Sequence, residues 1–169
     1  MPQSNMMTSE RSAIELIAQP LTLPCGLTLP SRLVKCPMQE TLAAGPYYDP
    51  PTTYFSKLYD TWGRSQYGLI ITGQVQVDIR FLSIKGDVVV HDESMEPEHF
   101  EKWKEWAAVS KRHGTPSIVQ LAHPGRRSPA GAGNRPSSMQ TLCPSSVPLK
   151  PETSWLDKLV CDTMTPQSR

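Results

Sequence analysis

Short apolar segments alternate with amphipathic segments along this chain, and that alternation limits the fold more than any other feature. Strand-like runs occupy residues 32–36, 69–72 and 117–121. Helical patterns fill the two intervals between them, over residues 51–65 and 96–113. Strands that alternate with helices form parallel sheets with right-handed crossovers. The sequence therefore predicts an α/β fold.

The two predicted helices carry local signals for their faces and ends. Tyr54, Leu58 and Trp62 follow one another at i, i+4 and i+8, which places them on one face of the first helix. In the second helix Pro97 suits the first turn, and Gly114 follows the last turn as a stop. Both helices are thus expected to pack one face against the sheet.

The strand segments differ in pattern. Residues 20–29 alternate with period two on either side of Gly26, which predicts a small hairpin. The runs at 69–72 and 117–121 are apolar without alternation, which is typical of strands buried on both faces. A long loop is expected over residues 76–93.

The segments at the two ends differ in composition from the centre. Residues 1–18 form a polar lead, and residues 124–169 are rich in proline, glycine and serine. The whole chain contains 17 prolines in 169 residues, about twice the average usage. We therefore expect three parts: the lead at 1–18, the α/β region at 19–123, and a loop-rich tail at 124–169.

Charge and hydropathy exclude several classes of function. Lysine and arginine total 17 against 16 acidic residues, a net charge of +1, so no nucleic-acid-binding surface is indicated. A run of 18 or more apolar residues is missing, which predicts no membrane span. The N-terminal residues lack an apolar signal core, so a cytoplasmic protein is expected.

Cysteine and histidine spacing does not indicate a metal site. The four cysteines form no CxxC pair, and the four histidines form neither an HExxH motif nor an i, i+4 pair. Reduced thiols with packing roles are the simplest interpretation. The sequence therefore predicts no metal ligands.

In a parallel α/β fold, ligands bind at the carboxyl ends of the strands. No GxGxxG or GxxxxGK[ST] phosphate loop is present, and no serine nucleophile elbow. The residues that follow the three strands are the candidate site residues: Pro37, Met38 and Gln39 after the first, Gly73 after the second, and Gln120, His123 and Arg126 at the third.

Three short blocks of the sequence resemble blocks of a known family, both in their order and in their separation along the chain. They are residues 31–38 (SRLVKCPM), 68–73 (GLIITG) and 120–126 (QLAHPGR), preceded by a hairpin-like segment at 20–29 (PLTLPCGLTL). Together they are similar to the N-terminal part of the fungal old yellow enzymes, NADH:flavin oxidoreductases also called ene-reductases. The resemblance implies an FMN cofactor, NAD(P)H as reductant, and about the first three β/α units of a TIM (β/α)₈ barrel.

The resemblance also implies cofactor-binding roles. Pro37 and Met38 match positions whose backbone lies against the flavin, and Gln39 matches a position near flavin O4 and N5 that is usually Thr or Cys. Gly73 matches a small residue that lets the ring approach the second strand. Gln120 matches the amide that binds the pyrimidine edge, which offers an N–H donor beside carbonyl acceptors; a carboxamide carries both complements.

His123 and Arg126 match residues that line the substrate site, and no residue of this chain is assigned the catalytic proton transfer. Each candidate has a structural alternative. Gln120 could be a hydrogen-bonded polar residue of the core, and His123 a structural histidine. Arg126 could belong to a solvated loop pair with Arg127, and Gly73 could only relieve packing.

A complete (β/α)₈ barrel needs about 250 residues. The family's later His-x-x-His or His-x-x-Asn pair, which holds the substrate, does not occur here. By resemblance the function is FMN-dependent reduction of activated alkenes, acting on a small enone-type molecule, with weak or no activity for this chain alone. The alternatives are a non-catalytic remnant or interaction module, and a half-enzyme completed by a partner chain; whether the chain by itself is an enzyme stays open.

Overall fold

The computed structural model describes residues 13–129, 131–145 and 147. These residues form two compact units. Unit 1 is drawn from residues up to 38, from 52–73 and from 103–120. Unit 2 is drawn from 39–51, from 74–102 and from 121 onward.

The centre of unit 1 is a parallel sheet. Strand β3 (Val34–Lys35) pairs with the first part of β4 (Leu69–Gln76), with Val34 beside Leu69. Strand β6 (Ser117–Ala122) also pairs with β4. At the start of this second pairing the Ile70 N–H donates to the Pro116 carbonyl at 2.9 Å.

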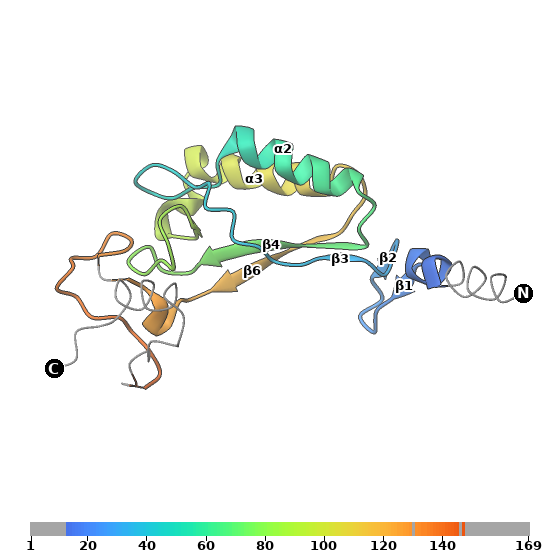
Figure 1. The fold of residues 1–169 in the computed structure, drawn as a ribbon. Coiled ribbons are helices and arrows are strands. Elements are labelled where there is room, and N and C mark those ends of the chain that lie inside the picture. The colour runs from blue at the N-terminus through green and yellow to red at the C-terminus, as the bar shows by residue number, and fades with distance from the viewer. Residues whose placement is uncertain (1–12, 130, 146, 148–169) are drawn as a thin grey trace, which may run out of the picture. The chain divides into compact units, whose positions relative to one another are not determined.

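Two helices connect these strands and lie on one side of the sheet (Figure 1). Helix α2 (Thr52–Arg64) leads from β3 to β4, and helix α3 (Pro97–Lys111) precedes β6. The predicted order of strand, helix, strand, helix and strand is therefore confirmed. The result is a partial α/β fold with parallel strands and not a closed barrel, which confirms the fold class expected from the sequence.

The helices pack on each other through aromatic rings. Phe55 and Tyr59 of α2 lie 5.1 and 5.4 Å, centroid to centroid, from Trp106 of α3, in edge-to-face geometry. Tyr59 is fully buried and Phe55 almost so. Aromatic pairs at such distances stabilise by about 0.5–1.5 kcal/mol beyond their area burial. This cluster is the core of unit 1.

The predicted hairpin is also present in unit 1. Strand β1 (Leu21–Thr22) pairs antiparallel with β2 (Thr28–Leu29). Gly26 supplies the positive φ of 87° that the turn requires. Residues 13–18 precede the hairpin as helix.

Unit 2 contains a strand in the segment that was expected to be a long loop. Strand β5 (Val88–Val89) pairs parallel with the end of β4, with Val75 beside Val88. The segment between them also buries Phe81 and Leu82 almost completely. The loop prediction was wrong here, because a two-residue strand shows no periodicity and the segment makes its own apolar core.

Two short 3₁₀ helices complete unit 2, η1 (Asp92–Met95) and η2 (Gly125–Arg127). Beyond η2 the proline-rich segment is ordered around Arg135, which is buried. The Arg135 guanidinium donates to Ser128 Oγ at 2.5 Å and to the Pro129 carbonyl at 2.6 Å. Its carbon Cζ lies 4.8 Å from the centre of the Phe81 ring. Burial lowers the pKa of Arg135 from its ordinary value.

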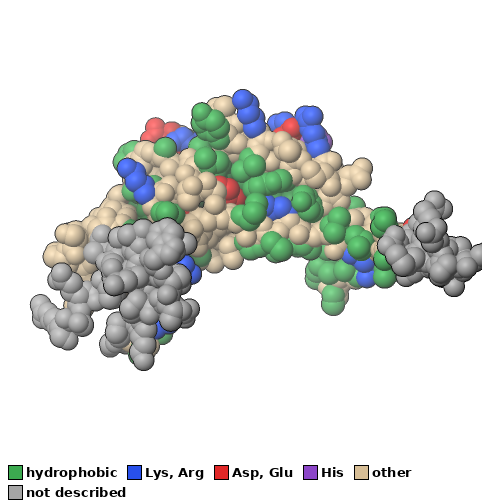
Figure 2. Space-filling model, in the orientation of Figure 1, with side chains coloured by type: hydrophobic (Ala, Val, Ile, Leu, Met, Phe, Trp, Pro, Cys, Tyr) green, Lys and Arg blue, Asp and Glu red, His purple; other side chains and the backbone are tan. Residues whose placement is uncertain are grey.

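The prediction that β6 is buried on both faces was wrong. In unit 1, Ile118 and Val119 are each 48% exposed, and Val34 of β3 is 39% exposed. Figure 2 shows hydrophobic side chains reaching the surface of the molecule. The two helices cover one face of the sheet, and among the described residues β6 pairs with β4 alone. Apolar side chains of β3 and β6 are therefore exposed to solvent at an open edge of the sheet.

The described cysteines Cys25, Cys36 and Cys143 are unpaired; Cys25 and Cys36 are exposed, so the packing role expected of the thiols was wrong for these two. A search of the described residues finds no helix whose length and apolar character would let it cross a bilayer.

Candidate functional site

Strands β4 and β6 bring two predicted site residues, Gly73 and Gln120, close together in unit 1. The Gln120 backbone N–H donates to Thr72 Oγ1 at 3.1 Å. The Thr72 hydroxyl in turn donates to the Gly73 carbonyl at 2.8 Å. Thr72 and Gly73 are both buried, and the Gly73 N–H donates to the hydroxyl of Tyr59 at 3.4 Å. Helix α2 and the strands β4 and β6 therefore hold this backbone in place.

The side chain of Gln120 is exposed, and its carboxamide makes no hydrogen bond to another described residue. It is therefore not a buried, hydrogen-bonded polar residue of the core, which was the structural alternative. A free carboxamide offers two N–H donors and one carbonyl acceptor. Gly73 lies within β4, one residue after the Thr72 whose hydroxyl accepts from the Gln120 backbone N–H.

Pro37 and Met38 follow β3 and belong to unit 1. Both are exposed, and the Met38 side chain is 54% exposed. An exposed thioether side chain packs adaptably against an apolar ligand. The structure therefore leaves the chain after β3 open to solvent at the carboxyl end of the strand.

Gln39, the next predicted site residue, belongs to unit 2 and has a partner there. Its Nε2 donates to Asp87 Oδ1 at 2.5 Å. Asp87 is buried and also accepts from Gln76 Nε2 at 2.9 Å and from the Ser83 N–H at 3.0 Å. Gln74 lies within 3.4 Å of both carboxylate oxygens. One buried carboxylate thus orients three glutamine side chains.

His123 and Arg126 both lie in unit 2 and both make local contacts. His123 Nδ1 accepts from the Gly125 N–H at 3.1 Å, and its ring lies 5.4 Å from that of Phe81. Arg126 Nη1 donates to the Val147 carbonyl at 3.3 Å. Both side chains remain exposed. These contacts fit the structural alternatives as well as a substrate-lining role.

A second polar cluster in unit 2 was missed by sequence reasoning. Asp49, His91, His99 and Lys102 meet there, although 42 positions separate Asp49 from His91 and 50 separate it from His99. Burial raises the pKa of Asp49, but hydrogen bonds from Lys102, His99 and His91 outweigh it, so the pKa is lowered overall. No local spacing rule detects such a cluster, because its members come from separate segments.

Comparison with known proteins agrees with the motifs. No family model matches the sequence. The chain is 41% identical over 130 residues to the NADH-dependent flavin oxidoreductase iliE of Hypocrea jecorina, covering 77% of this chain and 32% of that protein. It is 40% identical over 133 residues to the NADH-dependent flavin oxidoreductase iccE of Talaromyces variabilis, covering 79% and 32%.

Solved structures show the same fold at lower identity. The old yellow enzyme from Trypanosoma cruzi superposes with a TM-score of 0.64 at 20% identity, over 80% of this chain and 36% of that one. Morphinone reductase superposes with a TM-score of 0.62 at 22% identity, over 78% and 32%.

The fold of the described residues is therefore that of one part of an old yellow enzyme barrel. In sequence the chain is similar to an N-terminal part of curated NADH-dependent flavin oxidoreductases, and in fold it is similar to part of the old yellow enzymes. The chain spans 32% of the length of the curated relatives iliE of Hypocrea jecorina and iccE.

Proposed function

We propose that this chain contributes the part of an FMN site that recognises the flavin pyrimidine ring, in an NAD(P)H-dependent oxidoreductase that reduces activated alkenes. The observation that carries the proposal is the exposed carboxamide of Gln120, which makes no hydrogen bond to another described residue, on the strand that pairs with β4 and its Gly73. The likeness to curated NADH-dependent flavin oxidoreductases supports it.

The residues of unit 1 fit the cofactor. Gln120 would donate to a pyrimidine carbonyl and accept from the ring N–H, and Gly73 would let the ring approach β4. The exposed Pro37 and Met38 would lie against the same ring. When bound, FMN supplies hydride transfer between a nicotinamide and an activated alkene; the protein supplies orientation and electrostatics.

The roles of the unit 2 residues are part of the same proposal. Gln39 would contact the flavin near O4 and N5, held in place by Asp87. His123 and Arg126 would line the pocket for a small enone-type substrate. The unpaired cysteines Cys25 and Cys36 support a reducing, cytoplasmic location.

A titration with two ligands tests the ring-recognition role. Lumiflavin has the ring without the phosphate chain, and FMN has both. If recognition is through Gln120, lumiflavin binding weakens about tenfold in Gln120→Ala, because one or two hydrogen bonds of about 1 kcal/mol are lost. Gln19→Ala, at another exposed glutamine of unit 1, leaves it unchanged.

The measurement is the chemical-shift change of amides in the 169-residue chain as each ligand is added. Equal affinity for lumiflavin and FMN is expected, because the ring makes the contacts that this chain provides. Absence of ring binding up to millimolar concentration would refute the proposal, and so would equal binding by the wild type and Gln120→Ala.

A second candidate is that the chain acts as one part of a split enzyme or as an interaction module. The specific observation is the exposed apolar edge of β6, with Ile118 and Val119 in solvent. The occupant would be a polypeptide carrying the remaining barrel strands. Co-expression with the C-terminal two thirds of one of the NADH-dependent flavin oxidoreductases named above would then yield a stable one-to-one complex that contains flavin. Separate elution of the two polypeptides would contradict the split-enzyme proposal.

A further inference from the structure

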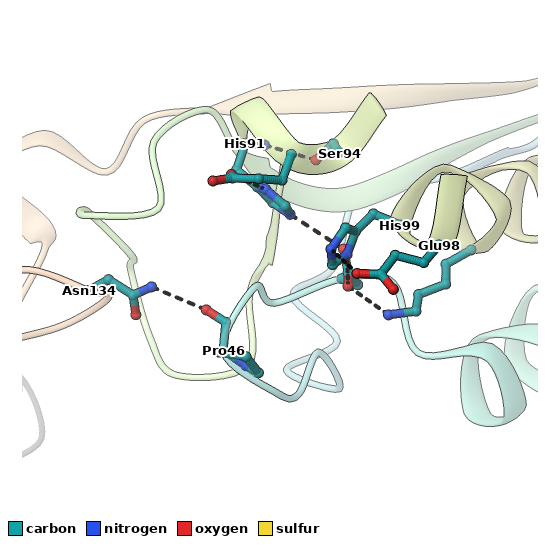
Figure 3. A network of polar contacts seen from close by, with 9 residues as sticks. Pro46, His91, Ser94, Glu98, His99 and Asn134 are labelled. Carbon is teal, nitrogen blue, oxygen red and sulfur yellow. Dashed lines mark hydrogen bonds and ion pairs between the residues drawn. The ribbon is translucent and has the colours of Figure 1, made fainter. Parts of the chain in front are cut away.

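Three segments of unit 2 place an aspartate and two histidines around one point (Figure 3). Asp49 ends the tight turn closed by the bridge between Ala44 and Asp49. His91 stands two residues after β5, where its N–H donates to Ser94 Oγ at 3.0 Å. His99 lies in the first turn of α3. A helix positions His99, the bridge to Ala44 positions Asp49, and the hydrogen bond to Ser94 positions the backbone of His91.

The geometry of the three groups is close to that of a metal site. Asp49 Oδ1 lies 3.4 Å from His91 Nε2, and Asp49 Oδ2 lies 2.7 Å from His99 Nδ1. One ligand atom from each residue can be chosen so that all lie within 4.8 Å of one another. Ligand atoms bound to one Zn²⁺ at about 2.0–2.1 Å are about 3.3 Å apart in a tetrahedral site. Small side-chain rotations would thus bring the three atoms to coordinating distance.

The outer nitrogens of both histidines face carboxylates. His91 Nδ1 lies 3.0 Å from Glu93 Oε2, and His99 Nε2 lies 3.3 Å from Glu98 Oε1. Histidines that bind a metal typically donate their second ring N–H to a carboxylate, which fixes the tautomer and makes the inner nitrogen a better ligand. Each imidazole in this cluster has its inner nitrogen on the common aspartate and its outer nitrogen on a glutamate.

The cluster is enclosed. The side chains of His91, His99 and Asp49 are 2%, 7% and 8% exposed. Tyr47 covers both imidazoles, with ring centroids 5.2 Å from His91 and 4.6 Å from His99. An apolar shell that limits solvent is a regular part of metal sites, because it strengthens the interaction of the ion with its ligands.

The ammonium group of Lys102 would compete with a metal ion for the Asp49 carboxylate. Lys102 Nζ lies 2.7 Å from Asp49 Oδ2, and the Lys102 side chain is 38% exposed. The ammonium group balances the carboxylate in the metal-free protein, and its long stem lets it move into solvent when a divalent cation replaces it. An ion-pair network of Lys102, the two histidines and Asp49 is the alternative interpretation.

We propose that Asp49, His91 and His99 form a binding site for a divalent transition-metal ion of the Zn²⁺ type. Two imidazole nitrogens and one carboxylate oxygen suit Zn²⁺ and its neighbours, whereas Mg²⁺ and Ca²⁺ prefer oxygen ligands. On binding, the two nitrogens that face Asp49, His91 Nε2 and His99 Nδ1, coordinate the ion, with each imidazole neutral. The protons that these nitrogens carried are released to solvent. The ion would tie the 44–49 turn, the end of β5 and the start of α3 together.

The test uses the full 169-residue chain, treated with a chelator and then titrated with ZnCl₂ by calorimetry, with CoCl₂ as a spectroscopic probe. One equivalent of Zn²⁺ is expected to bind with a Kd of micromolar or below, and Co²⁺ is expected to give a visible d–d spectrum with nitrogen ligands. His91→Gln and Asp49→Asn should each weaken binding at least about tenfold, and Glu93→Gln, on an exposed side chain, by about tenfold.

Two further variants separate the metal site from the ion-pair network. His113→Gln, at an exposed histidine of unit 1 that faces Asp60, should leave Zn²⁺ binding unchanged. Lys102→Met removes the competing cation and should tighten binding. The proposal is overturned if no one-to-one binding occurs, if His91→Gln and Glu93→Gln bind as the wild type does, or if Lys102→Met destabilises the protein without tightening Zn²⁺ binding. None of these results depends on flavin.

Discussion

Asp87 of unit 2 offers the sharpest test of the polar interior, because one buried carboxylate accepts hydrogen bonds from several elements. The three shortest come from Gln39 Nε2 at 2.5 Å, Gln76 Nε2 at 2.9 Å and the Ser83 N–H at 3.0 Å. Asp87 is 2% exposed and Gln76 is fully buried. Substitution of Asp87 by alanine leaves these donors facing an apolar methyl group.

The magnitude follows from what each donor can do afterwards. A hydrogen bond to a charged group contributes about 1.5–3 kcal/mol. Gln39 is exposed and Ser83 is half-buried, so water can replace part of their loss, whereas the Gln76 amide stays out of reach of solvent. We therefore expect Asp87→Ala to lower the free energy of unfolding by about 3–4 kcal/mol. Asp87→Asn keeps one acceptor and should lose about 2 kcal/mol.

The assay is urea unfolding followed by tryptophan fluorescence and far-ultraviolet circular dichroism. Asp92→Ala is the matched control, because Asp92 is an exposed carboxylate of the same unit and should change stability by less than about 0.5 kcal/mol. If Asp87→Ala does not fold, Asp87→Asn still gives a measurable shift. A loss below about 1 kcal/mol for Asp87→Ala would show that the glutamine amides are solvated and that the buried hub is not formed.

Two further predictions concern unit 1. Gly68→Ala would place a Cβ 1.9 Å from the Ser31 carbonyl oxygen, so the melting temperature should fall and the free energy of unfolding should decrease by about 3 kcal/mol. Gly26→Ala would meet no neighbour within 4 Å but would keep a φ of 87°, so the free energy of unfolding should decrease by only about 1 kcal/mol. The pKa of Asp60 is lowered by the hydrogen bond with His113 and by the charges of Arg64 and Arg112. The ionised Asp60 therefore stabilises the fold above the ordinary carboxyl pKa, and this stabilisation is lost as the pH falls through the lowered pKa of the folded state. In denaturant unfolding at a series of acidic pH values, the unfolding free energy of Asp60→Asn should change less with pH than that of the wild type.

The helices could be predicted because their signals are local. The spacing of Tyr54, Leu58 and Trp62 and the terminal Pro97 and Gly114 gave boundaries within two residues of those of α2 and α3. The face predicted for α2 was wrong, because Phe55 and Tyr59 are buried whereas Tyr54 is 67% exposed. The helix ends could still be found, because each signal acts over one or two turns of helix. The same holds for the hairpin around a glycine with positive φ.

What could not be predicted depends on contacts between distant segments. β5 is too short to show a period, and its place beside β4 comes from hydrogen bonds across the segment that contains Phe81 and Leu82. The Asp87 hub and the Asp49 cluster likewise join residues that are far apart in the chain. Gly73 and Gln120 could be proposed as site residues only because blocks that resemble a family surround them, and their hydrogen-bonded chain through Thr72 has no sequence signature.

The open edge of the sheet links stability to the candidate flavin site. Side chains alternate along a strand, so Ile118 and Gln120 point to the same face of β6, and Ile118 is 48% exposed there. Burying an aliphatic side chain of this size stabilises by about 1.5–3 kcal/mol, which favours a further layer over this face. Because Gln120 shares that face and its strand pairs with β4 alone among the described residues, whatever covers the sheet also sets how tightly the Gln120 carboxamide is held. In the proposed FMN site, recognition of the ring is therefore coupled through one strand to whatever covers this face of the sheet.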